Sequence, residues 1–416
     1  MNSSWSGFLA ICLTVSSLTA NAADPPRAEP FLMAGRLSDG ARDLKAHLEA
    51  QPGDDQTRFG LGTLQFLQAV EHFGQSLYRY GAGTSRTPLG IRVPLLQMPV
   101  PENPDPEPIS YADFRRMLQT LIDDLAKAEQ TLSAIKDRDV KLPLRFAQIR
   151  LDLTGGGRAT DEETLWRIYA AVSRNARADQ QFTQAEAEAF TISFDYGDVH
   201  WLAGYCHLLS ALGEMALTYD GEAFFNAIAS HAFARPAHPL LKEELMIRPD
   251  NRWTEDIADA IAAIHLLRMP VKEPQRGPEA LNHLEAVIRH SRLSWLAIQE
   301  EADDDREWVP NPRQTGVIPG VRVTQDMIAG WHTFLDEAEQ LLQGRKLAPH
   351  WRVKGEYGIN LKRVFTEPRE LDLVLWAHGA GVAPFVERGL CTRQETWNRL
   401  MQTFQGQFIG FAVWFN

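Results

Sequence analysis

Cysteine is scarce in this sequence, with three residues in 416, and none of them belongs to a Cys-x-x-Cys pair. The chain also lacks a His-Glu-x-x-His zinc motif, a glycine-rich phosphate loop ending in Lys-Ser/Thr, and a Gly-x-Ser-x-Gly nucleophile turn. Each of these motifs sets ligands or a nucleophile at the spacing that its chemistry requires. The chain therefore has none of these standard sites of hydrolases and nucleotide-binding proteins.

Positive charge is also in short supply. The chain has 42 Lys and Arg against 54 Asp and Glu, a formal net charge of −12, and it has no dense block of Lys or Arg. An acidic protein repels nucleic acid and anionic lipid, so we expect no nucleic acid among its partners. Hydrophobic residues make up 44% of the chain, which is ordinary for a globular protein with a sizeable core.

Long apolar runs are missing except at the N-terminus. Residues 1–22 contain no charged side chain, an apolar stretch extends from Phe8 to Leu18, and Ala20-Asn21-Ala22 has the small residues of a cleavage site. This pattern predicts a signal peptide at 1–22 and a periplasmic or secreted mature protein. A lipoprotein signal ending at Cys12 and a buried N-terminal helix are the alternatives. No later segment is long enough for a membrane span.

Two cysteines, Cys206 and Cys391, remain after cleavage, in a compartment where they could pair. Cys206 lies on the apolar stripe of a predicted helix, where a free buried thiol is the commoner outcome. We therefore expect a free Cys206, with a disulfide as the alternative.

Helical patterning dominates and predicts a mainly α fold, an irregular multi-helix body with at most a small β hairpin near the C-terminus. The predicted helices cover residues 39–49, 56–80, 110–132, 143–151, 162–177, 198–218, 254–267, 277–297 and 324–343. Strand patterning is limited to 357–365 and the tail 407–416. The chain divides into the signal peptide, a helix pair within 23–87, a proline-rich loop or linker over 88–109, and a helical body over 110–416.

The helix pair near 39–80 turns at Pro52-Gly53 and continues into "FGLG". This opening resembles that of a tetratricopeptide helix pair, although no second copy follows at a fixed period. The resemblance implies paired helices that would present a groove to a peptide or protein partner.

Two pairs of histidines share one spacing. His200 and His207 are seven residues apart on a predicted helix, and His283 and His290 repeat that spacing on another. Seven residues span about 10 Å along a helix, too far for two ligands of one metal. A zinc site would need ligands from elsewhere, and partly buried histidines beside the helix-capping Asp198 are the simpler interpretation.

The segment 152–163, "DLTGGGRATDEE", is the closest approach to a known site. It resembles the twelve-residue calcium loop of EF-hand proteins, which wraps a hard cation with oxygens from alternate positions and turns at a sixth-position glycine. The resemblance assigns metal-ligand roles to Asp152, Thr154, the Arg158 carbonyl, Thr160 and Glu163, with Gly157 at the turn. It implies one weak calcium site and no other cofactor.

This loop departs from the EF-hand pattern, because Gly156 stands where Asp or Asn is usual and Ala159 replaces a branched apolar residue. An ion-free alternative is a capping box, in which Thr160 and Glu163 each bind the other's main-chain amide. Both interpretations use the Glu163 carboxylate.

The acidic run from Glu300 to Glu307 is predicted to be a solvated loop. Taken together, the sequence favours an exported helical binding or scaffolding protein of unknown partner over an enzyme. An enzyme would place its pocket around Asp195, His200 and His207, and its acid and base groups would have to converge there.

Overall fold

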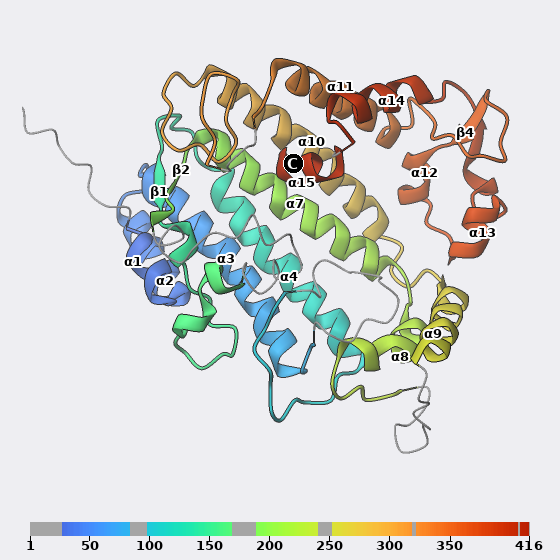
Figure 1. Cartoon of the computed structure of the whole chain (residues 1–416), viewed down its shortest axis with the longest axis horizontal. Helices are drawn as coiled ribbons and strands as arrows, with labels where there is room; N and C mark the ends of the chain where they lie inside the picture. The colour runs from blue at the N-terminus through green and yellow to red at the C-terminus, as the bar shows by residue number, and fades with distance from the viewer. Residues whose placement is uncertain are drawn as a thin grey trace, which may run out of the picture.

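The computed structural model describes residues 27–83, 98–168, 189–239, 252–317, 322–406 and 408–415. Within these ranges the fold is mainly α with small two-stranded antiparallel sheets, as the sequence predicts (Figure 1). The predicted signal peptide 1–22 and residues 88–97 of the proline-rich loop lie outside the described residues. Residues 98–109 form no helix and make one isolated bridge, between Ile109 and Pro236.

In chain order the helices are α1 (Glu29–Ala34), α2 (Leu37–Ala50), α3 (Asp55–Arg79), α4 (Tyr111–Leu132), α7 (Tyr196–Thr218), α8 (Glu222–Ala232), α9 (Arg252–Leu266), α10 (Arg276–Glu300), α11 (Gln325–Leu342), α12 (Leu361–Thr366), α13 (Leu373–His378), α14 (Gln394–Thr403) and α15 (Phe408–Phe415). Three short 3₁₀ turns in the described ranges are η2 (Phe146–Gln148), η3 (Asp161–Glu163) and η6 (Ala383–Phe385). The helices predicted over 39–49, 56–80, 110–132, 198–218, 254–267, 277–297 and 324–343 are confirmed with small differences at their ends. The start of the helix predicted over 162–177 is wrong, because η3 ends at Glu163 and Thr164 is extended, and residues 169–177 lie outside the described residues.

Capping side chains fix where the central helices begin. Asp54 accepts a hydrogen bond from the Thr57 amide, 2.9 Å, at the start of α3. Ser110 forms a capping box with Asp113 at the start of α4, and Asp195 accepts from the Gly197 amide, 2.8 Å, at the start of α7. These contacts satisfy amides that have no partner within the helix, which is why each helix starts at that residue.

Neighbouring helices pack in the order α2, α3, α4, α7 and α10, and α11 lies against α10 (Figure 1). One buried cluster joins the N-terminal helix pair to the body, since it includes Leu44 of α2, Leu64 of α3, Leu125 of α4 and Ala203 of α7. A second cluster around Trp295 packs α10 against α11, α14 and α15. The bundle thus places α7 between α4 and α10, with neighbours on both sides.

The helix predicted over residues 143–151 is wrong. β1 (Leu142–Leu144) pairs antiparallel with β2 (Ile192–Phe194), with Leu142 opposite Phe194, and η2 follows. Leu142 and Leu144 are buried while Pro143 between them is exposed, which is the alternation of a strand. Proline also lacks the amide that a helix interior requires.

The C-terminal strands also differ from expectation. β4 (Tyr357–Ile359) pairs with β6 (Val386–Arg388), and α12 follows β4 directly because Asn360 caps it. The tail predicted as a strand is the helix α15, because its aromatic residues also fit a helical spacing and pack on Trp331 of α11 and on Phe404, which follows α14. A further pair joins β3 (Arg268–Met269) to β5 (Leu371–Asp372).

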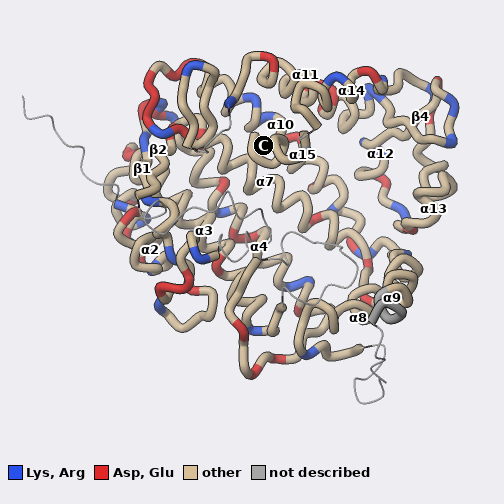
Figure 2. Tube along the Cα trace, viewed as in Figure 1, with Lys and Arg blue, Asp and Glu red and all other residues tan. Residues whose placement is uncertain are grey.

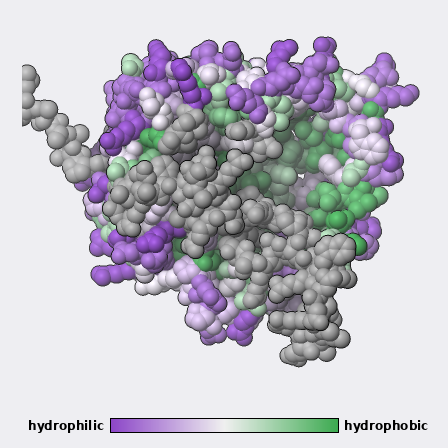
Figure 3. Space-filling view, viewed as in Figure 1, coloured by the Kyte–Doolittle hydropathy of each residue, from purple (hydrophilic) through white to green (hydrophobic). Residues whose placement is uncertain are grey.

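On the surface, Lys and Arg are scattered among Asp and Glu along the described chain (Figure 2). Exposed apolar side chains gather on α9 and α13, in an area on the right of Figure 3. They are Ile257, Ile261, Ile264, Leu373, Val374 and Leu375. In the described part of the chain, no helix combines the length and apolar character needed to cross a bilayer.

Candidate metal centre

The facing sides of α7 and α10 carry histidines at matched positions. His200 faces His290, with their Nδ1 atoms 3.3 Å apart, and His207 faces His283, with their Nδ1 atoms 2.9 Å apart. The two helices therefore run antiparallel: a step of seven residues toward the C-terminus on α7 corresponds to a step of seven residues toward the N-terminus on α10. The ring centroids of His207 and His290 are 5.4 Å apart, so His290 lies beside both histidines of α7.

A third helix adds a carboxylate to this group. Glu129 of α4 places its Oε1 atom 3.6 Å from Nε2 of His207, which is too long for a hydrogen bond. One ligand atom from each of Glu129, His207 and His290 lies within 4.8 Å of the others. Among the described residues, the buried Nε2 atom of His207 has no hydrogen-bond partner. Three helices thus converge on one point inside the bundle.

The surroundings set the protonation of these groups. Burial, together with the neighbouring histidines, lowers the pKa of His290 to about 3. The pKa of Glu129 is lowered by the neighbouring His207 ring and by the hydrogen bond from the Ser133 hydroxyl, against the opposing effect of burial. At neutral pH His290 offers an unprotonated nitrogen and Glu129 an ionised carboxylate. These are the forms in which both side chains bind metal ions.

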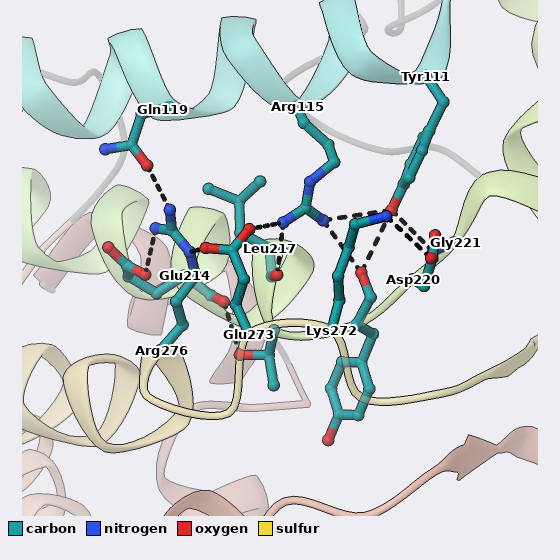
Figure 4. Close-up of polar contacts among 12 residues, drawn as sticks. Tyr111, Arg115, Gln119, Glu214, Leu217, Asp220, Gly221, Lys272, Glu273 and Arg276 are labelled. Atoms are coloured by element: carbon teal, nitrogen blue, oxygen red, sulfur yellow. Dashed lines mark hydrogen bonds and ion pairs between the residues drawn. The ribbon is translucent and has the colours of Figure 1, made fainter.

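A network of polar contacts joins the three helices at one end (Figure 4). Arg276 of α10 forms an ion pair with Glu214 of α7 at 2.9 Å and donates to Gln119 of α4 at 2.6 Å. Arg115 of α4 donates to the Leu217 carbonyl oxygen of α7 at 2.9 Å. The ion pair of Arg276 is largely buried, so breaking it leaves an uncompensated charge.

This network also sets the register of α7 against α10. Glu214 lies seven residues after His207, and Arg276 lies seven residues before His283. The ion pair therefore occupies the next step in the series of facing positions that contains the two histidine pairs. By fixing that register, it holds the histidines opposite one another.

Sequence patterns identified part of this centre. The matched seven-residue spacings of His200–His207 and His283–His290 are apparent in the sequence, but they favour partly buried histidines over a zinc site, which would need ligands from elsewhere in the chain. Glu129 is not recognisable as a ligand from the sequence, because the apolar residues on the other side of α4 dominate its pattern. Its signal would have been a carboxylate on a flank of an amphipathic helix, which is common on solvated faces.

A second polar group surrounds the N-terminal end of α7. Asp195, Glu301 and Glu307 each place a carboxylate oxygen within 4.8 Å of the others. Burial, with the nearby charge of Asp195, raises the pKa of Glu301 to about 8 and that of Glu307 to about 7. Asp195 and Glu301 also line a cavity of about 360 Å³ together with Arg138 and Tyr196.

Two expectations bear on this region. The acidic run was predicted to be solvated, which holds for Asp303 to Arg306 but is wrong for Glu307, whose exposed fraction is 3%. Glu307 turns inward because its carboxylate accepts from the Asp305 amide at 2.9 Å and its backbone bridges to Gly316. Asp195 lines the cavity described above, whereas His200 and His207 are not among the residues that line it.

The predicted calcium loop closes on itself through hydrogen bonds. Asp152 accepts from the amides of Gly156 at 3.0 Å and Gly157 at 2.7 Å, and the hydroxyl of Thr154 lies 3.3 Å from the same carboxylate. Gly157 has a φ of 82°, which favours glycine at this turn. Asp152 is itself buried, and its amide donates to Glu71 of α3 at 2.7 Å.

The other end of this loop confirms the capping box. The Glu163 carboxylate accepts from the Thr160 amide at 2.7 Å and from the Leu153 amide at 2.8 Å. Arg158 and Thr160 are exposed. The structure brings Asp152, Thr154 and Glu163 into one hydrogen-bonded loop, and calcium binding there stays a prediction.

Cys206 and Cys391 are free thiols, as expected, with Cys206 buried in α7. Comparisons with protein-family models, with curated proteins and with solved structures found no match to this chain. The geometry of the side chains is therefore what points to a function. Among the described residues, the group of Glu129, His207 and His290 has the donor chemistry most typical of a metal site.

Proposed function

We propose that this protein is an exported helical binding protein that holds one divalent transition-metal ion, zinc in the first place, between α4, α7 and α10. The observation that carries the proposal is the convergence of one ligand atom each from Glu129, His207 and His290 within 4.8 Å. Helix-bundle interiors commonly hold metals in this way, with side chains from facing helices.

The donor set favours zinc and related metals. Two imidazole nitrogens and one carboxylate oxygen suit zinc, copper, nickel and iron, whereas calcium and magnesium prefer shells of oxygen alone. The ligands lie on three separate helices, so a bound metal would also tie α4, α7 and α10 together. The calcium loop at 152–163 and a peptide partner for the helix pairs remain separate predictions of the sequence.

The buried polar network supports a site that exists before metal binds. Arg276 contacts both Glu214 and Gln119 and so holds three helices at a fixed register without any ion. A preformed site loses little conformational freedom on binding, which favours affinity. The enzyme alternative has weaker support, because neither His200 nor His207 is among the residues that line the cavity of about 360 Å³ at Asp195.

Zinc titration of the full chain tests the proposal. The chain is stripped with a chelator, exchanged into chelator-free buffer and titrated with zinc chloride in a calorimeter. We expect one equivalent to bind, because one group of three ligands converges. His290→Leu and Glu129→Gln should each weaken zinc binding at least tenfold. The control is His378→Leu, which removes an exposed histidine of α13.

The outcome that overturns the proposal is equally direct. If the chain binds no zinc, the proposal is wrong. It is also wrong if His290→Leu and His378→Leu change zinc binding to the same extent, because the metal would then not bind at this site. Calcium titrated at the same concentration should give no heat that depends on Glu129, since the histidine nitrogens are poor ligands for calcium.

A further inference from the structure

We infer that His283, His200 and Ser133 are positioning residues of this metal site, each holding one ligand so that its metal-binding atom faces the shared point. The inference rests on the proposed function, because there is nothing to position unless a metal binds. Metal ligands in proteins are typically held by a second hydrogen bond on the side away from the metal. Such contacts fix the tautomer of a histidine and the orientation of a carboxylate.

His207 has the arrangement that a ligand histidine requires. Its Nε2 atom faces Glu129 and, among the described residues, has no hydrogen-bond partner, while its Nδ1 atom lies 2.9 Å from Nδ1 of His283. A neutral ring that ligates through Nε2 carries its proton on Nδ1. His207 therefore donates this proton to His283, and His283 accepts. That hydrogen bond selects the tautomer in which Nε2 of His207 is free for the metal.

His290 repeats the arrangement with the roles of the helices exchanged. Its Nδ1 atom lies 3.3 Å from Nδ1 of His200, which leaves Nε2 as the nitrogen available to a metal. The ring of His200 is held in turn by the ring of Tyr196, whose centroid lies 5.0 Å away in an edge-on arrangement. The Nδ1 contact therefore lets His200 orient the ring of His290, as His283 does for His207.

Glu129 has a positioning partner on its own helix. Ser133 follows it by one helical turn, and the Ser133 hydroxyl donates to Oε1 of Glu129 at 2.6 Å. Oε1 is also the oxygen that lies 3.6 Å from Nε2 of His207, so Ser133 holds the oxygen that faces His207 and leaves its second lone pair for a metal. Each of the three ligands is thus held by one partner, and none of the partners is needed as a ligand.

These roles explain why the seven-residue spacing of histidines occurs on both α7 and α10. On α7, His207 is a ligand and His200 is a positioning residue, while on α10, His290 is a ligand and His283 is a positioning residue. Two ligands of one metal cannot lie seven residues apart on one helix, because that distance is about 10 Å. A ligand and a positioning residue can lie seven residues apart on one helix. The facing helix must then place its positioning residue opposite the ligand and its ligand opposite the positioning residue.

Two substitutions of nearly equal size test the role of His283. Asparagine places an acceptor oxygen near the former Nδ1 position, whereas leucine fills similar space without an acceptor. We expect His283→Leu to weaken zinc binding by about 10- to 100-fold, and His283→Asn to recover about tenfold of that loss. Zinc affinity is measured by competition with a chromophoric chelator, and cobalt is bound as a spectroscopic probe.

Each outcome decides the question. Equal losses in His283→Leu and His283→Asn, with cobalt spectra altered alike, would overturn the inference, because a direct ligand or a packing role would be lost in both. Variants that bind zinc as tightly as the wild type would overturn it too. A wild type that binds no zinc would instead remove the proposed function.

A second variant keeps the test valid where His283→Leu fails to fold. Ser133 is exposed at the end of α4, so Ser133→Ala should leave the metal-free fold unchanged by circular dichroism. We expect a loss of zinc affinity of up to about tenfold, restored in Ser133→Thr, which keeps the hydroxyl. Equal affinity in Ser133→Ala and the wild type would overturn the role of this residue.

Discussion

Replacing Glu301 by glutamine should stabilise this protein in mildly basic solution and have little effect in acid. Glu301 lies beside Asp195 at the start of α7, and burial raises its pKa from 4.5 to about 8. The folded state therefore holds a proton that the unfolded chain releases near pH 4.5. The free energy of unfolding falls as pH rises from about 4.5 to about 8, because over that window the folded state binds more protons.

The magnitude follows from the size of the shift. A rise from 4.5 to about 8 would correspond to roughly 5 kcal/mol at 1.36 kcal/mol per pKa unit. Glu301 is only partly buried, so solvent screening reduces this to about 1 to 3 kcal/mol. Glutamine resembles the protonated acid and can still donate to Asp195. Glu301→Gln should therefore remove the fall in the free energy of unfolding between about pH 4.5 and pH 8.

The assay is urea unfolding at pH 5 and pH 8.5 in buffer that contains a chelator. We expect the free energy of unfolding of Glu301→Gln to exceed that of the wild type by about 1 to 3 kcal/mol at pH 8.5. At pH 5 the two free energies should be equal. Glu300→Gln is the control, since it removes the same charge from the exposed neighbouring residue. If the gain in unfolding free energy over the wild type is no larger at pH 8.5 than at pH 5 in Glu301→Gln, or if Glu300→Gln shows an equal gain at pH 8.5, the reasoning is refuted.

Three further predictions concern other parts of the molecule. Arg276→Met should lower the free energy of unfolding by about 3 kcal/mol, because Glu214 is left buried without its partner, and adding Glu214→Met should restore most of the loss; chemical denaturation measures both. Calcium at a hundredfold excess over its dissociation constant should stabilise the wild type by about 2.7 kcal/mol but not Glu163→Gln, and identical melting of the wild type with calcium and with chelator would end the calcium prediction. Native alkylation followed by mass spectrometry should modify Cys391 but not the buried Cys206, and a mass that shows a disulfide between them would contradict the fold.

The sequence predicted the helices well because apolar residues repeat at the helical period over many turns. It failed over 143–151, where Leu142 and Leu144 alternate around a proline in a stretch too short for periodicity to decide. It failed again in the tail, where nearly every residue is apolar, so that strand and helix spacings fit equally well. Local pattern carries little information in such segments.

The candidate site was predictable only in part, for a related reason. The spacing of His200 and His207 is a property of one helix and can be seen in the sequence. That His207 meets Glu129 and that His290 meets both depends on which helices pack together and in which register. The long-range ion pair of Arg276 with Glu214 helps to set that register, and no local pattern encodes it.

The central claim is that a metal ion binds where α4, α7 and α10 meet. Anomalous diffraction from crystals grown with zinc, measured on both sides of the zinc absorption edge, tests it most directly. We predict one strong anomalous peak at about 2.0 to 2.2 Å from a nitrogen of His207, a nitrogen of His290 and an oxygen of Glu129. An ordered bundle with no peak at this position, or with its zinc bound at Asp195 instead, would contradict the account.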